Sequence, residues 1–165
     1  MAFNRVVLWL LLPCIFAGCY SFHGGSPPAG VKTIAVPTVA DASGFGNATI
    51  SQQCTTQLIQ KIIRDNSLQI ADRQSADASL SATITTITMK TTAVGADQRT
   101  SLEEVDVGIK VSLENLRKHT TLWEQTFSNS AQFDPTGDAS QRDNAILQAI
   151  DHITDDIVLQ TVSEW

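Results

Sequence analysis

Few residues of this chain have the types and the spacing that catalysis or metal binding requires. His152, Asp155 and Asp156 are spaced i, i+3, i+4, which would place three potential metal ligands on one face of a helix. No second pair of ligands accompanies them, so a hydrated acidic face is the preferred interpretation. Glu104 and Asp106 share one face of a predicted strand, but their row is otherwise polar, which favours a solvated face over an acid–base pair. We therefore expect no metal site and no cofactor.

Motifs for nucleotide binding and for nucleophilic catalysis are also missing from the sequence. The segment Gly44-Phe45-Gly46 lacks the further glycine and the preceding strand that a dinucleotide-binding loop needs. The chain holds no G-x-S-x-G motif, so an enzyme is not expected. Its 11 Lys and Arg residues against 17 Asp and Glu residues give a net charge of −6. This balance, without a basic stripe, argues against a general nucleic-acid binder.

The strongest chemical signal is Cys19, near the N-terminus. Residues 1–18 carry Arg5 and then an apolar run that ends at Phe16, which is too short to cross a hydrocarbon core of about 30 Å. The segment Phe16-Ala17-Gly18-Cys19 resembles the bacterial lipobox, although that pattern prefers leucine where Phe16 stands. In a lipobox the cysteine thiol forms a diacylglycerol thioether and becomes the first mature residue. We therefore predict a lipoprotein signal peptide at 1–18 and lipidation of Cys19; an ordinary secretory leader is the alternative.

The residues around Cys19 also predict a location. Tyr20 stands where many lipoproteins kept at the inner membrane carry an acidic residue. By resemblance to that sorting pattern, we expect the periplasmic face of the outer membrane, held there by the N-terminal lipid anchor. Once the leader and the lipidated residue are accounted for, Cys54 is the one thiol left, and its apolar helical position predicts a buried, unreactive side chain.

The rest of the chain is expected to form one lipid-tethered domain. Residues 19–30 are rich in Gly, Ser and Pro, which predicts a lipidated tether. Residues 31–165 are predicted to form a single domain. Strands are predicted at 31–36, 68–71, 78–89, 105–114 and 121–127, with a loop at 41–47 and a turn at 134–137. Helices are predicted at 49–66 and from Ser140 or a neighbouring cap to Val162. The fold class is α+β: two helices packed on one face of a mostly antiparallel four- to five-stranded sheet.

Three patterns support these elements. Residues 105–113 alternate strictly between apolar and polar, which indicates a strand with one buried face. In the strand before it the apolar phase slips by one residue, so we expect a β-bulge near Thr85 and Thr86. The first helix has a buried stripe of residues four apart, widened by two more isoleucines: Ile50, Cys54, Leu58 and Ile62, with Ile59 and Ile63.

Basic residues gather in one part of the chain. Five acids and half of the basic residues of the mature chain lie in the segment 90–118. The basic residues there are Lys90, Arg99, Lys110, Arg117 and Lys118. Such side chains could bind an anionic headgroup through charge-assisted hydrogen bonds. A mixed, solvated sheet edge is the alternative.

The order of several short segments resembles the LptE family of lipopolysaccharide-assembly lipoproteins, in the variant of Bacteroidetes-like bacteria. The resemblance runs along nearly the whole mature chain, and each segment alone is generic. The matching segments are Cys19-Tyr20-Ser21-Phe22, Lys32-Thr33-Ile34-Ala35, Leu58–Asp65, Leu68-Gln69-Ile70, Ala76-Asp77-Ala78, Trp123-Glu124-Gln125-Thr126-Phe127, Asp155-Asp156-Ile157-Val158 and Trp165.

The resemblance implies a non-enzymatic role. Such proteins insert into a large outer-membrane β-barrel, LptD, help it to assemble and contact lipopolysaccharide on its way to the outer leaflet. A threonine-rich strand face would suit a polar barrel interior, and it would suit water equally well. Basic residues near strand ends contact lipopolysaccharide in the family, which makes Lys90, Arg99 and Lys110 candidates here.

The main alternative is a different lipid-anchored α+β module. An activator of a peptidoglycan synthase, or a secretion-pore lipoprotein, would share the first strand, loop and helix. A lipid-anchored hydrolase would require a Ser/His/Asp site, which the sequence does not show.

Overall fold

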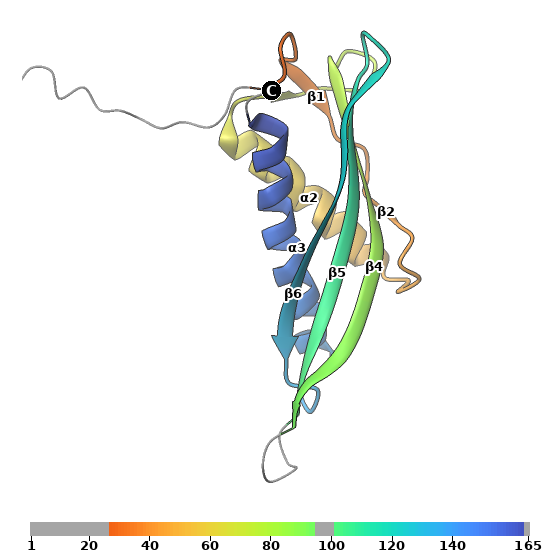
Figure 1. Ribbon diagram of the computed structural model, residues 1–165, viewed down its shortest axis with the longest axis vertical. Helices are drawn as coiled ribbons and strands as arrows, with labels where there is room; N and C mark the ends of the chain where they lie inside the picture. Colours follow the sequence, from red (N-terminus) through yellow and green to blue (C-terminus); the bar gives the residue numbers. More distant parts are fainter. Residues whose placement is uncertain (1–26, 95–100, 164–165) are drawn as a thin grey trace, which may run out of the picture.

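The computed structural model describes residues 27–94 and 101–163, which form six strands and two helices (Figure 1). In chain order these are β1 (Thr33–Ala35), β2 (Ala40–Asp41), α2 (Ala48–Asp65), β3 (Gln69–Ile70), β4 (Ala78–Val94), β5 (Ser101–Asn115), β6 (Thr120–Phe133) and α3 (Ala139–Val162). The predicted signal peptide, Cys19 and most of the tether lie outside the described residues.

All six strands belong to one mixed sheet. Its order is β3-β1-β4-β5-β6, and β2 also pairs with β4. The strands β1 and β2 run parallel to β4, and β1 runs parallel to β3, whereas β4, β5 and β6 form antiparallel hairpins. The α+β class is confirmed, but the expected antiparallel sheet of four to five strands is only roughly right. The parallel pairing of β1 with β3 is possible because α2 connects this part of the chain from one end of the sheet back to the other. Parallel neighbours need such a long connection.

The antiparallel hairpins extend well beyond their predicted ends. β4 continues to Val94 and β6 to Phe133, and the expected loop at 41–47 contributes Asp41 to the short strand β2. The predicted bulge is confirmed, since the register of β4 against β5 shifts between Ile84 and Thr86. After this shift Ile87 pairs with Val107 and Met89 with Val105, so both return to the helix side of the sheet, where Ile87 is partly buried and Met89 is 39% exposed.

Both helices cover the same face of the sheet, as Figure 1 shows. On α2 the predicted stripe is confirmed for its residues four apart: Ile50, Cys54, Leu58 and Ile62 are all buried. The expected contribution of Ile63 is wrong, because its side chain is 57% exposed. The inward row of β5, from Val105 to Leu113, is 0–1% exposed and forms the centre of the core.

Each helix begins at a side-chain cap. Asn47 Oδ1 accepts a hydrogen bond from the Thr49 backbone N–H at 3.0 Å and caps α2. Asp138 Oδ1 accepts one from the Ser140 backbone N–H at 3.0 Å, so α3 starts one residue before Ser140. A neighbour of Ser140 is therefore the cap, which was one of the two predicted possibilities.

Within the described residues, neither helix has the length and apolarity needed to cross a bilayer.

The buried row of β5 gives a direct test of this packing. Ile109 is 0% exposed and lies opposite Ile84 and Phe127. Ile109→Asp would bury an unpaired carboxylate at a cost of several kcal/mol, and we expect the cooperative thermal transition to be lost. The matched control Thr126→Asp adds the same carboxylate at an exposed position opposite Lys110, and it should melt like the wild type. A normal melting curve for Ile109→Asp would contradict the described register.

Candidate functional site

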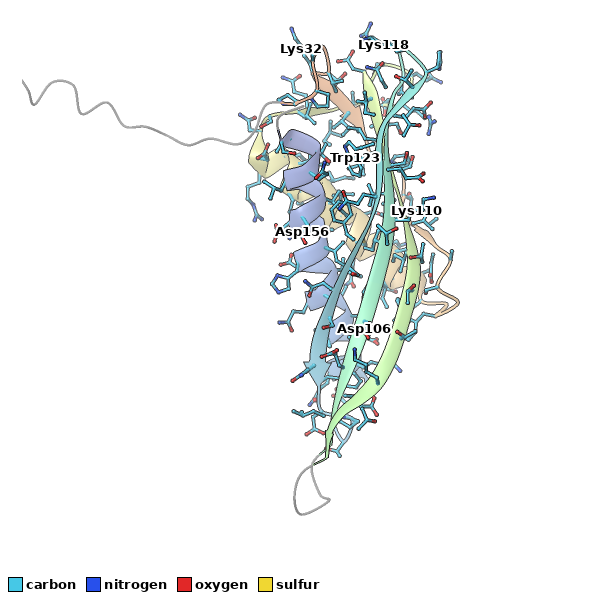
Figure 2. The ribbon with its side chains drawn as sticks, in the orientation of Figure 1. Lys32, Asp106, Lys110, Lys118, Trp123 and Asp156 are labelled. Carbon is cyan, nitrogen blue, oxygen red and sulfur yellow. The ribbon has the colours of Figure 1, made fainter. Side chains whose placement is uncertain are left out.

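The face of β4, β5 and β6 that points away from the helices is the most extended polar surface of the described chain. Cross-strand pairing places its residues, which we call the outer face: Ser81, Thr83, Thr86, Thr88 and Lys90 on β4, Glu104, Asp106, Gly108, Lys110 and Ser112 on β5, and Glu124, Thr126, Ser128, Ser130 and Gln132 on β6. Hydroxyl side chains dominate it. Figure 2 shows two of its charged members, Asp106 and Lys110, spread along the length of the sheet.

The β-bulge shapes the middle of the outer face. Gly108 lies opposite the bulged residues, and the Thr85 hydroxyl donates a hydrogen bond to its carbonyl at 3.2 Å. A Cβ at position 108 would come within 3.4 Å of Thr85 Oγ1 and of Thr86 Cβ. The glycine therefore lets two threonines pack across the strand where any side chain would be tight.

The candidate lipopolysaccharide-binding residues do not form one cluster. Lys90 Nζ lies 2.9 Å from Glu104 Oε1 and 3.0 Å from Asp106 Oδ2, and these carboxylates, Glu104 foremost, raise the pKa of Lys90. Lys110 Nζ lies 2.9 Å from Glu124 Oε1. Glu104, the cross-strand partner of Lys90, and Lys110 are six residues apart on β5, which is roughly 20 Å of strand. Arg99 lies outside the described residues.

The carboxylates around Lys90 and Lys110 change what these lysines offer to a ligand. Lys90 shares its charge with two carboxylates, so this part of the outer face is net negative. An anionic ligand would have to replace a carboxylate at either lysine. Ion pairs this exposed contribute little in water, so replacement of the carboxylate by a multiply charged phosphate is feasible.

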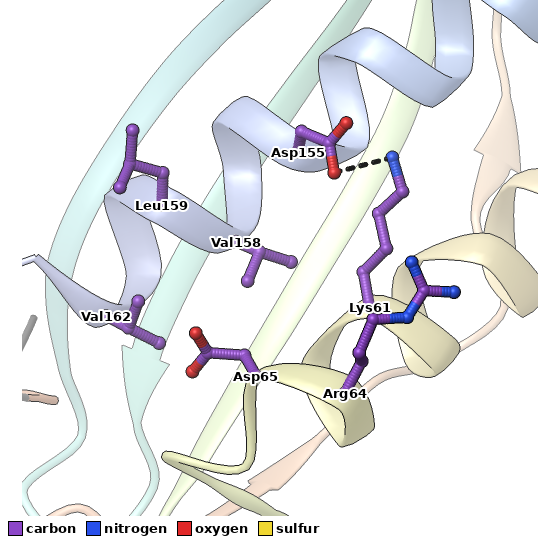
Figure 3. A pocket seen from close by; sticks show the side chains of 7 residues that line it. All are labelled: Lys61, Arg64, Asp65, Asp155, Val158, Leu159 and Val162. Atoms are coloured by element: carbon purple, nitrogen blue, oxygen red, sulfur yellow. Dashed lines mark ion pairs between the residues drawn. The ribbon is translucent and has the colours of Figure 1, made fainter. Parts of the chain in front are cut away.

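Asp155 is the member of the spaced set that contacts the other helix. Lys61 of α2 lies 2.8 Å from Asp155 (Figure 3) and 2.9 Å from Asp151, whereas His152 and Asp156 are exposed. A hollow of 290 Å³ lies beside this contact, lined by Lys61, Arg64, Asp65, Asp155, Val158, Leu159 and Val162. Across the described ranges, no three His, Cys, Asp or Glu side chains are grouped to hold a metal ion.

Cys54 is placed as the sequence indicates. It is 1% exposed in the contact between α2 and the sheet, and burial raises the pKa of its thiol to about 12. A thiol with this pKa is protonated at neutral pH, so Cys54 cannot act as a thiolate nucleophile.

Sequence reasoning missed Asp77, which connects three segments at one end of the molecule. Its Oδ2 accepts hydrogen bonds from the backbone N–H groups of Lys32 and Thr33 at 2.9 and 3.0 Å and from the Thr33 hydroxyl at 3.0 Å. Its Oδ1 accepts from Nε of Arg117, and its backbone carbonyl accepts from the Leu116 N–H at 2.8 Å. Asp77 was part of the Ala76-Asp77-Ala78 segment of the family resemblance, but nothing in the sequence marked a long-range role.

These donors set the charge state of Asp77. The hydrogen bond from the Lys32 backbone N–H, followed by that from Arg117, holds the pKa of the Asp77 carboxyl well below its usual value of 3.8. Because the pKa is lower in the folded than in the unfolded state, the ionised carboxylate stabilises the fold above pH 3.8. That stabilisation is lost as the pH falls further, through the folded-state pKa.

Asp77→Asn tests this connection. The amide keeps the size and one acceptor oxygen but loses the charge, so we expect a lower melting temperature at neutral pH. The difference from wild type should be constant above about pH 5 and should shrink below pH 4, where the native carboxylate begins to lose its advantage. Asp72→Asn, on the exposed turn before β4, is the control and should follow the wild type at every pH. A difference that persists unchanged at acid pH would show that the charge of Asp77 does not stabilise the fold.

Comparison with known proteins adds a family and a fold. The model of the LptE family, described as lipopolysaccharide-assembly, matches residues 31–161. No curated protein matches the sequence significantly.

Solved structures with this architecture include several from other bacteria. A DUF330 protein from Xanthomonas campestris is 11% identical with a TM-score of 0.58, covering 84% of this chain and 90% of its own. PelC from Paraburkholderia phytofirmans, a dodecamer, is 13% identical with a TM-score of 0.53, covering 85% and 95%. A minor lipoprotein from Acinetobacter baumannii is 12% identical with a TM-score of 0.51, covering 79% and 91%. At these identities the likeness establishes a shared fold.

Proposed function

Because the chain belongs to the LptE family, we propose that it is an outer-membrane lipoprotein that plugs an LptD-type β-barrel and supports its assembly, for lipopolysaccharide transport to the outer leaflet. The family is one of non-enzymatic lipopolysaccharide-assembly lipoproteins, so the chain is a lipopolysaccharide-assembly lipoprotein and not an enzyme. The barrel partner, the plugging role and the outer-membrane location are the proposed part.

The observation that carries the proposal is the outer face. It is long, polar and rich in hydroxyl groups, and both helices lie on the opposite side of the sheet. The interior wall of an outer-membrane barrel is itself polar. Hydroxyls on β4 and β6 can donate and accept hydrogen bonds without the desolvation cost of a buried charge. We place the barrel wall against this face.

Lipopolysaccharide would bind at basic residues of the same face and of the segment that follows β4. We propose Lys90, Arg99 and Lys110 as its contacts. The side chains of Lys90 and Lys110 are about half exposed, at 56% and 51%, so their ammonium groups are accessible to a phosphate. Exchange of Glu104 or Glu124 for a phosphate would allow the ligand to bind and leave again, which transport requires.

The lipid anchor is tested at Cys19. Cys19→Ala removes the thiol that would carry the diacylglycerol, so incorporation of labelled palmitate should fall to background. Cys54→Ala is the matched control: it removes a buried thiol and should leave palmitate labelling unchanged. Labelling that survives Cys19→Ala would contradict the anchor.

The barrel partner is tested by affinity purification from detergent-solubilised outer membranes, with mass spectrometry of the bound proteins. We expect a large β-barrel protein in equal amount with the tagged chain. Thr88→Trp with Ser128→Trp, which puts bulky rings on two strands of the outer face, should reduce its recovery at least tenfold. Gln53→Trp with His152→Trp, at exposed positions of the two helices, should not.

Other results of the purification would overturn the proposal. Recovery of a peptidoglycan synthase or of a secretion-pore component would favour the alternative functions, and recovery of no barrel would exclude a stable plug. Loss of the barrel with both double variants alike would show that the outer face is not the contact.

A further inference from the structure

A second charged surface lies at the end of the molecule where the described chain begins. It comprises residues from three segments, which we call the basic end: Lys32 before β1, Arg73 between β3 and β4, and Arg117, Lys118 and His119 in the β5–β6 turn. Figure 2 shows Lys32 and Lys118 together at this end, with Lys110 and Asp106 further along the sheet. The basic end is therefore distinct from the candidate lysines of the outer face.

Hydrogen bonds hold the basic end together. Asp77 binds the backbone of Lys32 on one side and the guanidinium of Arg117 on the other, and Arg73 lies 3.7 Å from Glu114. A hollow of 460 Å³ opens between the two turns, and its lining includes Arg73, Arg117 and His119. Three side chains that can donate to phosphate oxygens thus surround one recess.

The cations of the basic end remain available to a ligand. The side chain of Arg117 is 71% exposed although its Nε binds Asp77, and that of Arg73 is 59% exposed. Lys32 and Lys118 are exposed, and within the described residues no ion pair or side-chain hydrogen bond engages either ammonium group. The charge of the buried Asp77 is offset by Arg117, so the unpaired positive charge of this surface lies on Lys32 and Lys118. In a chain of net charge −6, a negatively charged surface would be attracted at this end and repelled elsewhere.

We propose that the basic end rests on an anionic phospholipid bilayer, with phosphate-bearing headgroups meeting Lys32, Arg73, Lys118 and the recess beside Arg117. The orientation rests on the proposed lipid anchor. From Cys19 to residue 27, where the described chain begins at this same end, eight residues span at most about 30 Å (Figure 1). The anchor therefore keeps the basic end close to the membrane, where cations near an anionic surface strengthen binding.

The test measures vesicle binding without the anchor. The chain from residue 19 onward, with Cys19→Ala, is sedimented with vesicles of phosphatidylglycerol in phosphatidylcholine or of phosphatidylcholine alone. We expect binding to the anionic vesicles at low salt, its loss at high salt, and none to the neutral vesicles. Inorganic phosphate at millimolar concentration should not compete, because the contact is a surface and not a single-ion site.

Two double variants separate position from net charge. Lys32→Gln with Lys118→Gln removes two positive charges from the basic end and should weaken binding roughly 30-fold, about 1 kcal/mol per basic residue. Gln52→Glu with Gln53→Glu changes the net charge equally at exposed positions on α2, and should weaken binding far less. Both should melt like the parent chain. Arg117 is left intact because it neutralises Asp77.

The inference is overturned if anionic and neutral vesicles bind equally, if both double variants lose the same affinity, or if free phosphate displaces the chain. These outcomes are independent of the proposed function. Palmitate labelling of Cys19 and recovery of the barrel are measured on the lipidated chain, so either can fail while vesicle binding persists.

Discussion

The carboxylate of Asp77 joins the start of β1, the start of β4 and the turn between β5 and β6. The linked residues are 40 to 45 positions apart in sequence, and β1 has only three residues. Strands as short as β1 and β3 have little cross-strand pairing of their own, so a buried anion with several donors supplies what the backbone ladder cannot. The same contact fixes the guanidinium of Arg117 beside the backbone of Lys32 at one end of the molecule. The alignment of these three segments thus depends on one buried charge.

The long hairpins are stabilised differently. β4, β5 and β6 present an apolar row to the helices and a polar row to the outside, so one face builds the core while the other carries the outer face. Lys61 of α2 pairs with two aspartates of α3, and both helices lie on the same side of the sheet. No described helix covers the outer face. This division lets a small domain keep a hydrophobic core on one face of the sheet and leave an extended polar face exposed on the other.

Sequence patterns predicted the two helices, the three long strands and the bulge near Thr85, because the apolar periods of 3.6 and 2 residues are local signals. They also predicted the short strand β3 within 68–71, but they missed β2, which has two residues and carries no period. They also failed for Ile63, which the pattern added to the buried stripe but which is 57% exposed.

The sequence by itself determined the lipobox-like segment at Cys19, the family resemblance, the α+β class and the absence of a catalytic motif, since each depends on residue types at short spacing. Tertiary structure decided which charges are available to ligands. It paired Lys90 and Lys110 with carboxylates across neighbouring strands, and it brought Lys32, Arg73 and Lys118 to one end from three distant segments. Charge neighbours of this kind arise from strand register and chain crossover, which are settled by packing of the whole domain and leave no local trace in the sequence.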